Sequence, residues 1–191
     1  MIPDQAACLR LMDQYRMPPH IRAHSLLVAR VAECLARALV ARGEPIRVEL
    51  VVAGALLHDL AKVLCLDGDC SHAELGAELC REHGYEELVP LVMEHVHLRD
   101  GFTGRCGERE IVFYADKRVN HDRLVSLEER RNDVIRRYAP RDKERQAQIW
   151  QNFDLCRRLE EHLFARLAMA PDELGDCLAV DGVLEIAAVQ A

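Results

Sequence analysis

The stretch of sequence that decides the fold is Ala55-Leu56-Leu57-His58-Asp59-Leu60-Ala61-Lys62. A histidine and an aspartate stand side by side at the end of an apolar run, and a lysine follows three residues later. An imidazole, a carboxylate and an ammonium group together suit a divalent metal ion and a phosphate group. Such a dipeptide also arises by chance, so its meaning depends on whether other segments bring matching side chains to it.

The segment that ends in His58 is predicted to be the central helix. It begins after Pro45, runs into His58 and Asp59, and is apolar almost all round. A helix without a polar face is typical of a position with neighbours on every side. Gly54 would let one of those neighbours approach closely.

Length and composition indicate one globular domain built from helices. The chain has 191 residues, of which 50% are hydrophobic and 5% aromatic, and this is enough for a sizeable core. The alternation of side chains typical of strands is nearly absent, so we predict an all-α helical bundle. The other helices are expected at about 4–15, 20–41, 71–83, 86–97, 108–121, 126–138 and 142–168.

The predicted helices divide into a main helical domain over 1–138 and a C-terminal helical extension and tail over 139–191. The apolar spacing of the long helix at 142–168 fits two arrangements. It would either pack back on the core or form a homodimer, and Trp150 and Phe153 would be buried in both cases.

Charge and hydropathy argue against two classes of partner. The net charge is −7 and the pI is near 5.7, whereas a general nucleic-acid binder usually has a basic face. No apolar run reaches the roughly 18 to 20 residues that span a membrane, and the first residues lack a secretory pattern. We expect a cytoplasmic protein without a membrane partner.

The eight cysteines are scattered along the chain, and no pair has CxxC spacing. We expect them to be reduced thiols. The alternative is a zinc site made by Cys65, Cys70 and Cys106, for which no fourth ligand is obvious.

Several polar side chains occupy positions where helical periodicity predicts the core. His24, His95 and Asp116 each share a helix face with aliphatic residues, and His72 follows Ser71, the predicted cap of its helix. Ionised groups in a core need a partner or a metal ion, because an unpaired buried charge is costly. The candidate metal ligands are His24, His58, Asp59, His72, His95 and Asp116.

Histidine and carboxylate ligands suit Fe, Mn, Co, Ni or Zn better than Ca or Mg. Six candidates exceed the needs of one ion that keeps an open site, which leaves room for a second divalent ion with Asp59 as the bridge. Each residue taken alone has another interpretation. A core histidine usually bonds a backbone carbonyl, Asp116 could pair with Lys117 or Arg123, and a lysine at a helix end is often solvated. The joint pattern favours a metal centre.

Three segments occur in the order found in the HD superfamily of metal-dependent phosphohydrolases, which residues 19–138 resemble. His24-Ser25-Leu26-Leu27-Val28-Ala29 is similar to the first motif of this superfamily. The stretch quoted at the start is similar to its signature, although Ala61 replaces the glycine of the His-Asp-Ile-Gly-Lys variant. Ile111-Val112-Phe113-Tyr114-Ala115-Asp116-Lys117 is similar to its last motif.

Two further segments resemble the branch of the superfamily with a dinuclear centre. They are His72-Ala73-Glu74-Leu75-Gly76-Ala77 and Val92-Met93-Glu94-His95. This branch includes bacterial enzymes that split diadenosine tetraphosphate symmetrically, as well as cyclic-dinucleotide phosphodiesterases, whose further motifs are missing here. The resemblance implies one ion held by His24, His58, Asp59 and Asp116 and a second held by Asp59, His72 and His95.

The resemblance implies a phosphohydrolase that acts on a nucleotide or a related phosphate ester or anhydride through metal-activated water. Asp59 and Lys62 are the expected catalytic residues, with Lys62 neutralising charge on the phosphoryl oxygens. Arg99, Lys117 and Arg118 are candidates for binding the rest of a small phosphorylated substrate. Loops near 67–70 and 99–107 are expected to line the pocket.

Three alternatives compete with this interpretation. The first is a non-catalytic HD domain that binds a nucleotide or a metal ion for regulation. The second is another chemistry of the same superfamily, such as a metal-dependent oxygenase or lyase. The third is an adaptor bundle of helices whose histidines are fortuitous.

Overall fold

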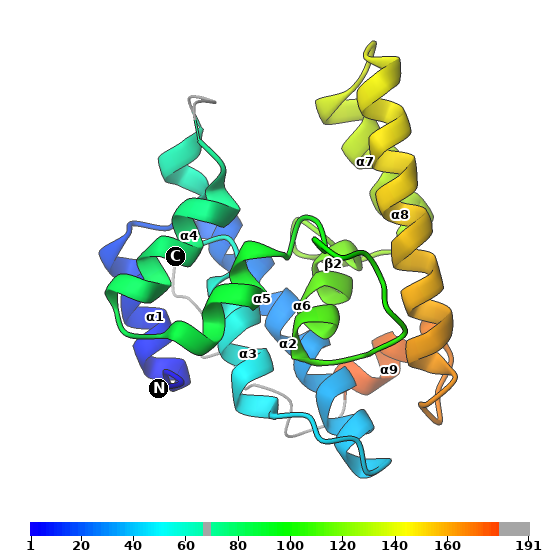
Figure 1. Ribbon diagram of the computed structural model, residues 1–191, viewed down its shortest axis with the longest axis horizontal. Helices are drawn as coiled ribbons and strands as arrows, with labels where there is room; N and C mark the ends of the chain where they lie inside the picture. The colour runs from blue at the N-terminus through cyan, green and yellow to red at the C-terminus, as the bar shows by residue number, and fades with distance from the viewer. Residues whose placement is uncertain (67–69, 180–191) are drawn as a thin grey trace.

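The computed structural model describes residues 1–66 and 70–179, and the predicted all-α bundle is confirmed. Three helices pack on one another at its centre: α2 (Pro19–Ala41), α3 (Val48–Leu57) and α6 (Glu108–Lys117) (Figure 1). The other α-helices are α1 (Gln5–Gln14), α4 (His72–Glu82), α5 (Val89–Met93), α7 (Leu127–Tyr138), α8 (Lys143–Phe164) and α9 (Leu174–Leu178). Short 3-10 helices are η1 (Lys62–Cys65), η2 (Glu86–Leu88) and η3 (Pro171–Glu173).

The core helix α3 is buried along nearly its whole length, as its apolar sequence predicts. Leu56 and Leu57 are fully buried, and Gly54 faces α5. A Cβ atom at Gly54 would lie 2.5 Å from Leu91 Cδ2, which is far inside van der Waals contact. The glycine therefore lets α5 approach α3 closely enough for the segments that follow the two helices to meet.

Two helices end earlier than predicted, and in each case a histidine side chain bonds a backbone carbonyl of the last turn. Helix α3 ends at Leu57 and α5 ends at Met93, so His58 and His95 lie just beyond helix ends. His58 Nδ1 lies 2.7 Å from the Ala55 carbonyl, and His95 Nδ1 lies 2.6 Å from the Val92 carbonyl. In a continuing helix these carbonyls would accept the next backbone N–H groups, so each side chain competes with the turn that would extend its helix.

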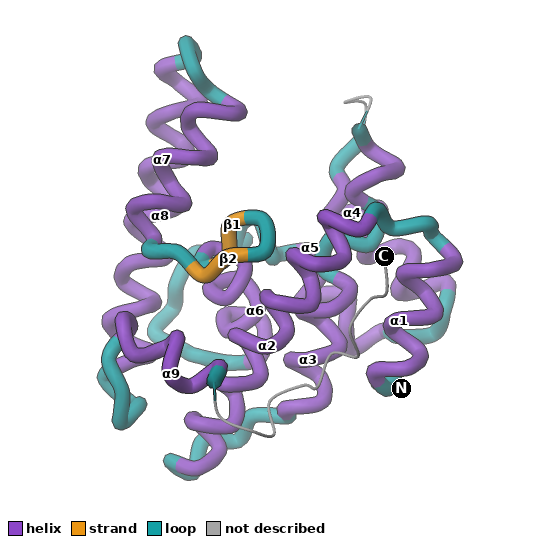
Figure 2. The backbone as a smooth tube through the Cα atoms, turned by 180° about the vertical axis from the view of Figure 1, so that it is seen from behind, coloured by secondary structure: helices purple, strands orange, loops and turns teal. Residues whose placement is uncertain are grey.

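The sixth predicted helix also ends early, at Lys117, because the chain turns into a small hairpin. Strand β1 (Val119–Asn120) pairs antiparallel with β2 (Arg123–Leu124), and Val119 lies opposite Leu124. His121 in the turn has a φ of 57°. Figure 2 shows the hairpin between α6 and the α7–α8 pair.

Helices α7 and α8 form an antiparallel pair that stands out from the core on one side (Figure 1). Phe153 and Leu159 of α8 are buried, but Trp150 is 45% exposed. The prediction that Trp150 is buried was therefore wrong. The Trp150 ring lies on the surface of the α7–α8 pair. The Cζ atom of Arg131 stacks over it, 3.7 Å from the ring centroid.

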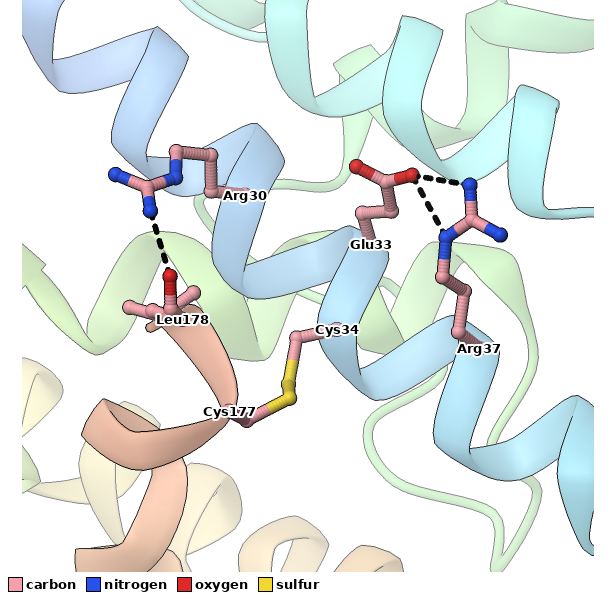
Figure 3. Close-up of a disulfide and its surroundings, with 6 residues drawn as sticks. All are labelled: Arg30, Glu33, Cys34, Arg37, Cys177 and Leu178. Atoms are coloured by element: carbon pink, nitrogen blue, oxygen red, sulfur yellow. Dashed lines mark hydrogen bonds and ion pairs between the residues drawn. A yellow bond between two sulfur atoms is a disulfide. The ribbon is translucent and has the colours of Figure 1, made fainter. Parts of the chain in front are cut away.

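The prediction that all cysteines are reduced was wrong for four of the eight. Cys34 of α2 forms a disulfide with Cys177 of α9, because α9 returns against α2, and Arg30 donates a hydrogen bond to the Leu178 carbonyl beside it (Figure 3). Cys65 and Cys70 form a second disulfide. This pairing leaves them no thiolate for the alternative zinc site.

Among the described residues, no helix has both the length and the apolar character needed to cross a membrane.

Candidate metal centre

The six predicted metal ligands meet at one place in the structure. Helices α2 and α6 contribute from within their length, α4 contributes its first residue, and the segments after α3 and α5 contribute the rest. All are buried except His72, whose side chain is 29% exposed. In chain order the six residues are His24, His58, Asp59, His72, His95 and Asp116.

Asp59 lies in the middle of this cluster, and each of its carboxylate oxygens faces a pair of histidines. Oδ2 lies 3.4 Å from His58 Nε2 and 3.9 Å from His24 Nε2. Oδ1 lies 3.4 Å from His72 Nε2 and 3.6 Å from His95 Nε2. The carboxylate is therefore shared between two groups of potential ligands, in each of which the ligand atoms lie within 4.8 Å of one another.

Asp116 completes the first of these groups. Its Oδ1 atom lies 3.1 Å from His24 Nε2 and 3.7 Å from His58 Nε2. That group thus has two imidazoles and two carboxylates, whereas the second has two imidazoles and the shared Asp59.

The backbone fixes which nitrogen of three imidazoles faces the cluster. The Nδ1 atoms of His24, His58 and His95 each lie within 3.0 Å of a backbone carbonyl. A carbonyl only accepts, so Nδ1 carries a proton and Nε2 is the nitrogen that points at the carboxylates. His58 Nε2 is buried without any hydrogen-bond partner. Although burial lowers it, the adjacent Asp59 carboxylate raises the pKa of His58. Without a metal ion a proton therefore lies between the imidazole and the carboxylate, and a divalent metal ion could take the place of that proton.

Burial and neighbouring charges shift the pKa values of the cluster. Burial, helped by the nearby His95, lowers the pKa of His72 to about 4. Burial also lowers the pKa of His95. Both rings are therefore neutral at pH 7, which is the form that binds metal ions.

The two carboxylates are ionised although they are buried. Burial alone would raise the pKa of Asp59, but His58 and Lys62 hold it well below its usual value. Lys117 and His24 similarly outweigh burial and hold the pKa of Asp116 well below its usual value. Two buried negative charges therefore face the histidine nitrogens.

The two lysines near the cluster have different environments. Lys62 Nζ lies 2.7 Å from Asp59 Oδ2, and its side chain is 34% exposed. Lys117 is buried, and its Nζ donates to Asp116 Oδ2 and to the His95 carbonyl, both at 2.8 Å. Lys62 thus keeps access to solvent beside the cluster, whereas the ammonium group of Lys117 is bound to protein acceptors.

The structure does not bring the two predicted substrate-binding arginines to the cluster. Arg118 is buried against α8, where it contacts the hydroxyl of Tyr114, the carboxylate of Glu160 and the carbonyl of Pro171. Arg99 is exposed, and neither arginine lines the cavity beside the cluster. Although Arg118 follows the Asp116 motif directly, its side chain therefore joins α6 to α8.

We expect Arg118→Met to destabilise the protein without removing metal ions from the cluster. Glu160 and the Pro171 carbonyl would lose their charged donor, so the free energy of unfolding should fall by about 2–3 kcal/mol. Chemical denaturation measures this loss, and elemental analysis measures the metal content. The exposed Arg99→Met is the control and should change stability by less than about 0.5 kcal/mol. A drop in metal content with unchanged stability would contradict this role of Arg118.

A cavity of about 830 Å³ opens beside the cluster. Asp59, Lys62 and Asp116 lie on one wall, and α7 and α8 form the other. The second wall includes Arg130, Val134, Tyr138, Arg145, Asn152 and Phe153. Of the loops expected to line the pocket, 99–107 contributes to a different groove, beside Arg47 and Glu108, and 67–69 lies outside the described residues.

Arg130 is a site residue that the sequence analysis missed. It belongs to α7, three residues after Leu127 and four before Val134, so helical spacing places it in an otherwise apolar stripe. A charged residue at an apolar position of a helix is also the pattern that singles out Asp116 in α6. The same pattern at Arg130 could have been found in the sequence.

The model of the HD domain family matches residues 21–154 of the chain. An uncharacterized protein of Methanocaldococcus jannaschii is 30% identical over 133 residues, which cover 62% of this chain and 75% of that protein. Ribonuclease Y of Pseudothermotoga lettingae is 28% identical over 165 residues, which cover 86% of this chain and 30% of the enzyme. The tRNA (cytidine(56)-2'-O)-methyltransferase of Thermoplasma volcanium is 27% identical over 143 residues, which cover 68% of this chain and 40% of the enzyme. The chain thus spans less than half of either named enzyme, and no solved structure gives a significant match.

Proposed function

Because the chain belongs to the HD domain family, we propose that it is a metal-dependent phosphohydrolase that cleaves a phosphate ester or anhydride of a small nucleotide. HD domains bind divalent metal ions and are typical of metal-dependent hydrolases. The observation that carries the proposal is the position of Asp59, whose two oxygens face separate histidine pairs. A carboxylate in that position suits a bridge between two ions.

We assign the candidate ligands to two sets. His24, His58, Asp59 and Asp116 would hold one ion, and Asp59, His72 and His95 would hold the other. This mixture of imidazole and carboxylate ligands favours Fe, Mn, Co, Ni or Zn. When bound, such ions supply an activated water and polarise a phosphoryl oxygen.

Two lysines near the ligands have different proposed roles. Lys62 lies at the border between Asp59 and the cavity, so its ammonium group would stabilise charge that develops on the phosphoryl oxygens. Lys117 donates hydrogen bonds from the buried side to the Asp116 carboxylate and to the His95 carbonyl, and so holds both in place. Lys62 is therefore the proposed substrate contact and Lys117 a positioning residue.

The size and lining of the cavity support the proposal that the substrate is a small phosphorylated molecule. Its volume of about 830 Å³ lies in the range of small-molecule sites. Arginine, amide and tyrosine side chains on its wall suit a phosphate group and a nucleoside. Two ions that polarise a phosphoryl oxygen and activate water would suit a nucleotide anhydride, which is therefore the first substrate class to test. The similarity to Ribonuclease Y makes short RNA the second substrate class to test.

Metal analysis combined with a hydrolysis screen tests the proposal. Purified full-length protein is stripped with a chelator and reloaded separately with Mn, Fe, Co, Ni or Zn. It is then incubated with dinucleoside polyphosphates, nucleoside triphosphates, bis(p-nitrophenyl) phosphate and a short labelled RNA. We expect about two ions per chain, and activity that disappears with the metal and returns with it. Stable metal binding with nucleotide-induced thermal shifts but no turnover would favour the regulatory alternative, and absence of metal binding would contradict both.

A further inference from the structure

We propose that Arg130 binds the phosphate group of the substrate through the free edge of its guanidinium group. This inference rests on the proposed function and assigns a phosphate contact to α7, outside the ligand-bearing helices. Arg130 is the fourth residue of α7 and lines the cavity beside the metal centre. Its side chain is 13% exposed, and Nη2 lies 4.0 Å from Asp116 Oδ1.

The hydrogen bonds of Arg130 are unevenly distributed over its guanidinium group. Nη1 donates to Asn120 Oδ1 of strand β1 at 3.0 Å, which fixes the orientation of the plane. Nε is buried without a hydrogen-bond partner, and Nη2 has no partner within hydrogen-bond distance among the described residues. Leaving a buried donor unpaired is costly. Nε and Nη2 together form the planar fork with which arginine binds two oxygens of a phosphate.

The nearby carboxylates do not account for this free edge. Asp133 lies 3.9 Å from Nη1, on the other edge, and it is already paired with Arg136 and Arg137. Asp116 already accepts a hydrogen bond from Lys117 and contacts His24. Both carboxylates therefore have closer cationic or imidazole partners than Arg130.

Arg130 and Lys62 each lie beside one of the two carboxylates of the first ligand group. Lys62 lies beside Asp59, Arg130 lies beside Asp116, and both line the same cavity. An anion that binds in the cavity next to these carboxylates would have both cations nearby. The ammonium group offers a point charge, and the guanidinium group adds orientation through two parallel hydrogen bonds.

Inorganic phosphate is the probe for this contact, and isothermal titration calorimetry on the Mn-loaded full chain is the measurement. We expect Arg130→Gln to weaken phosphate binding roughly 10- to 100-fold, the effect of losing hydrogen bonds between charged groups. The matched control is Arg131→Gln, since Arg131 is the next residue but stacks on Trp150. Its phosphate affinity should equal that of the wild type. Metal content is measured for every variant, so that a loss of ions is not mistaken for a loss of the phosphate contact.

A third variant keeps the test valid if Arg130→Gln does not fold. Arg130→Lys retains the charge but lacks the two-donor edge, so it should bind phosphate several-fold more weakly than the wild type. Equal phosphate affinity in the wild type and in a metal-loaded Arg130 variant would overturn the inference. So would equal weakening by Arg131→Gln, or failure of the metal-loaded wild type to bind phosphate. A wild type that takes up no metal contradicts the proposed function itself and removes the basis of this inference.

Discussion

Replacing Asp59 by asparagine is expected to reduce the metal content to at most one ion per chain and to lower phosphohydrolase activity at least roughly a thousandfold. The two side chains have nearly the same shape, but asparagine has one oxygen where aspartate has two. Because each oxygen of Asp59 faces its own histidine pair, the amide nitrogen would face one of these pairs. That nitrogen has no lone pair to offer a metal ion, so the pair would lose its shared ligand.

The measurement is elemental analysis of Asp59→Asn after reloading with Mn, together with activity on whichever substrate the wild type cleaves. Glu110→Gln is the matched control, because Glu110 is also a buried carboxylate but pairs with Arg109 away from the cavity. Its metal content should equal that of the wild type. If Asp59→Asn kept two ions and full activity, Asp59 would not be the bridge.

Helical periodicity predicted that these polar side chains face inward, because they are exceptions to a regular apolar pattern. His24 and Asp116 stand in apolar stripes of α2 and α6, and a buried polar group in such a stripe needs a partner. His95 was predicted to face inward, and it does so although its helix was predicted too long. The reason is that His95 turns back on the Val92 carbonyl and still faces the helices around it.

Contacts between distant segments were not predictable in the same way. Lys117 and Arg118 follow Asp116 directly, but successive helical residues point about 100° apart, so one reaches the His95 carbonyl and the other reaches α8. The disulfide between Cys34 and Cys177 joins residues 143 positions apart. The cavity wall likewise depends on how α7 and α8 return to the centre, which no local pattern specifies.

Lys117→Met is expected to have the largest effect on stability of any single change near the centre. The ammonium group is buried and donates to Asp116 and to the His95 carbonyl. Methionine fills a similar volume but carries no charge, so the metal-free protein would keep a buried carboxylate without its main cation. Breaking a buried ion pair in this way costs about 3–5 kcal/mol. Chemical denaturation of the chelator-treated protein measures the loss, and the exposed Lys143→Met should change stability by less than about 0.5 kcal/mol.

Metal ions should restore part of the stability that Lys117→Met loses. Lys117 keeps Asp116 ionised by holding its pKa low, and a bound divalent ion would supply positive charge to the same carboxylate. Ligands that bind the folded state raise the free energy of unfolding in proportion to the logarithm of their concentration, so Mn should stabilise the variant in a titration. The affinity of the variant for Mn should still be lower than that of the wild type. Lys117 no longer donates to the His95 carbonyl, so the backbone that positions the His95 imidazole is held less firmly. If the metal-free variant unfolded at the same denaturant concentration as the wild type, the buried ammonium group would not be what balances Asp116.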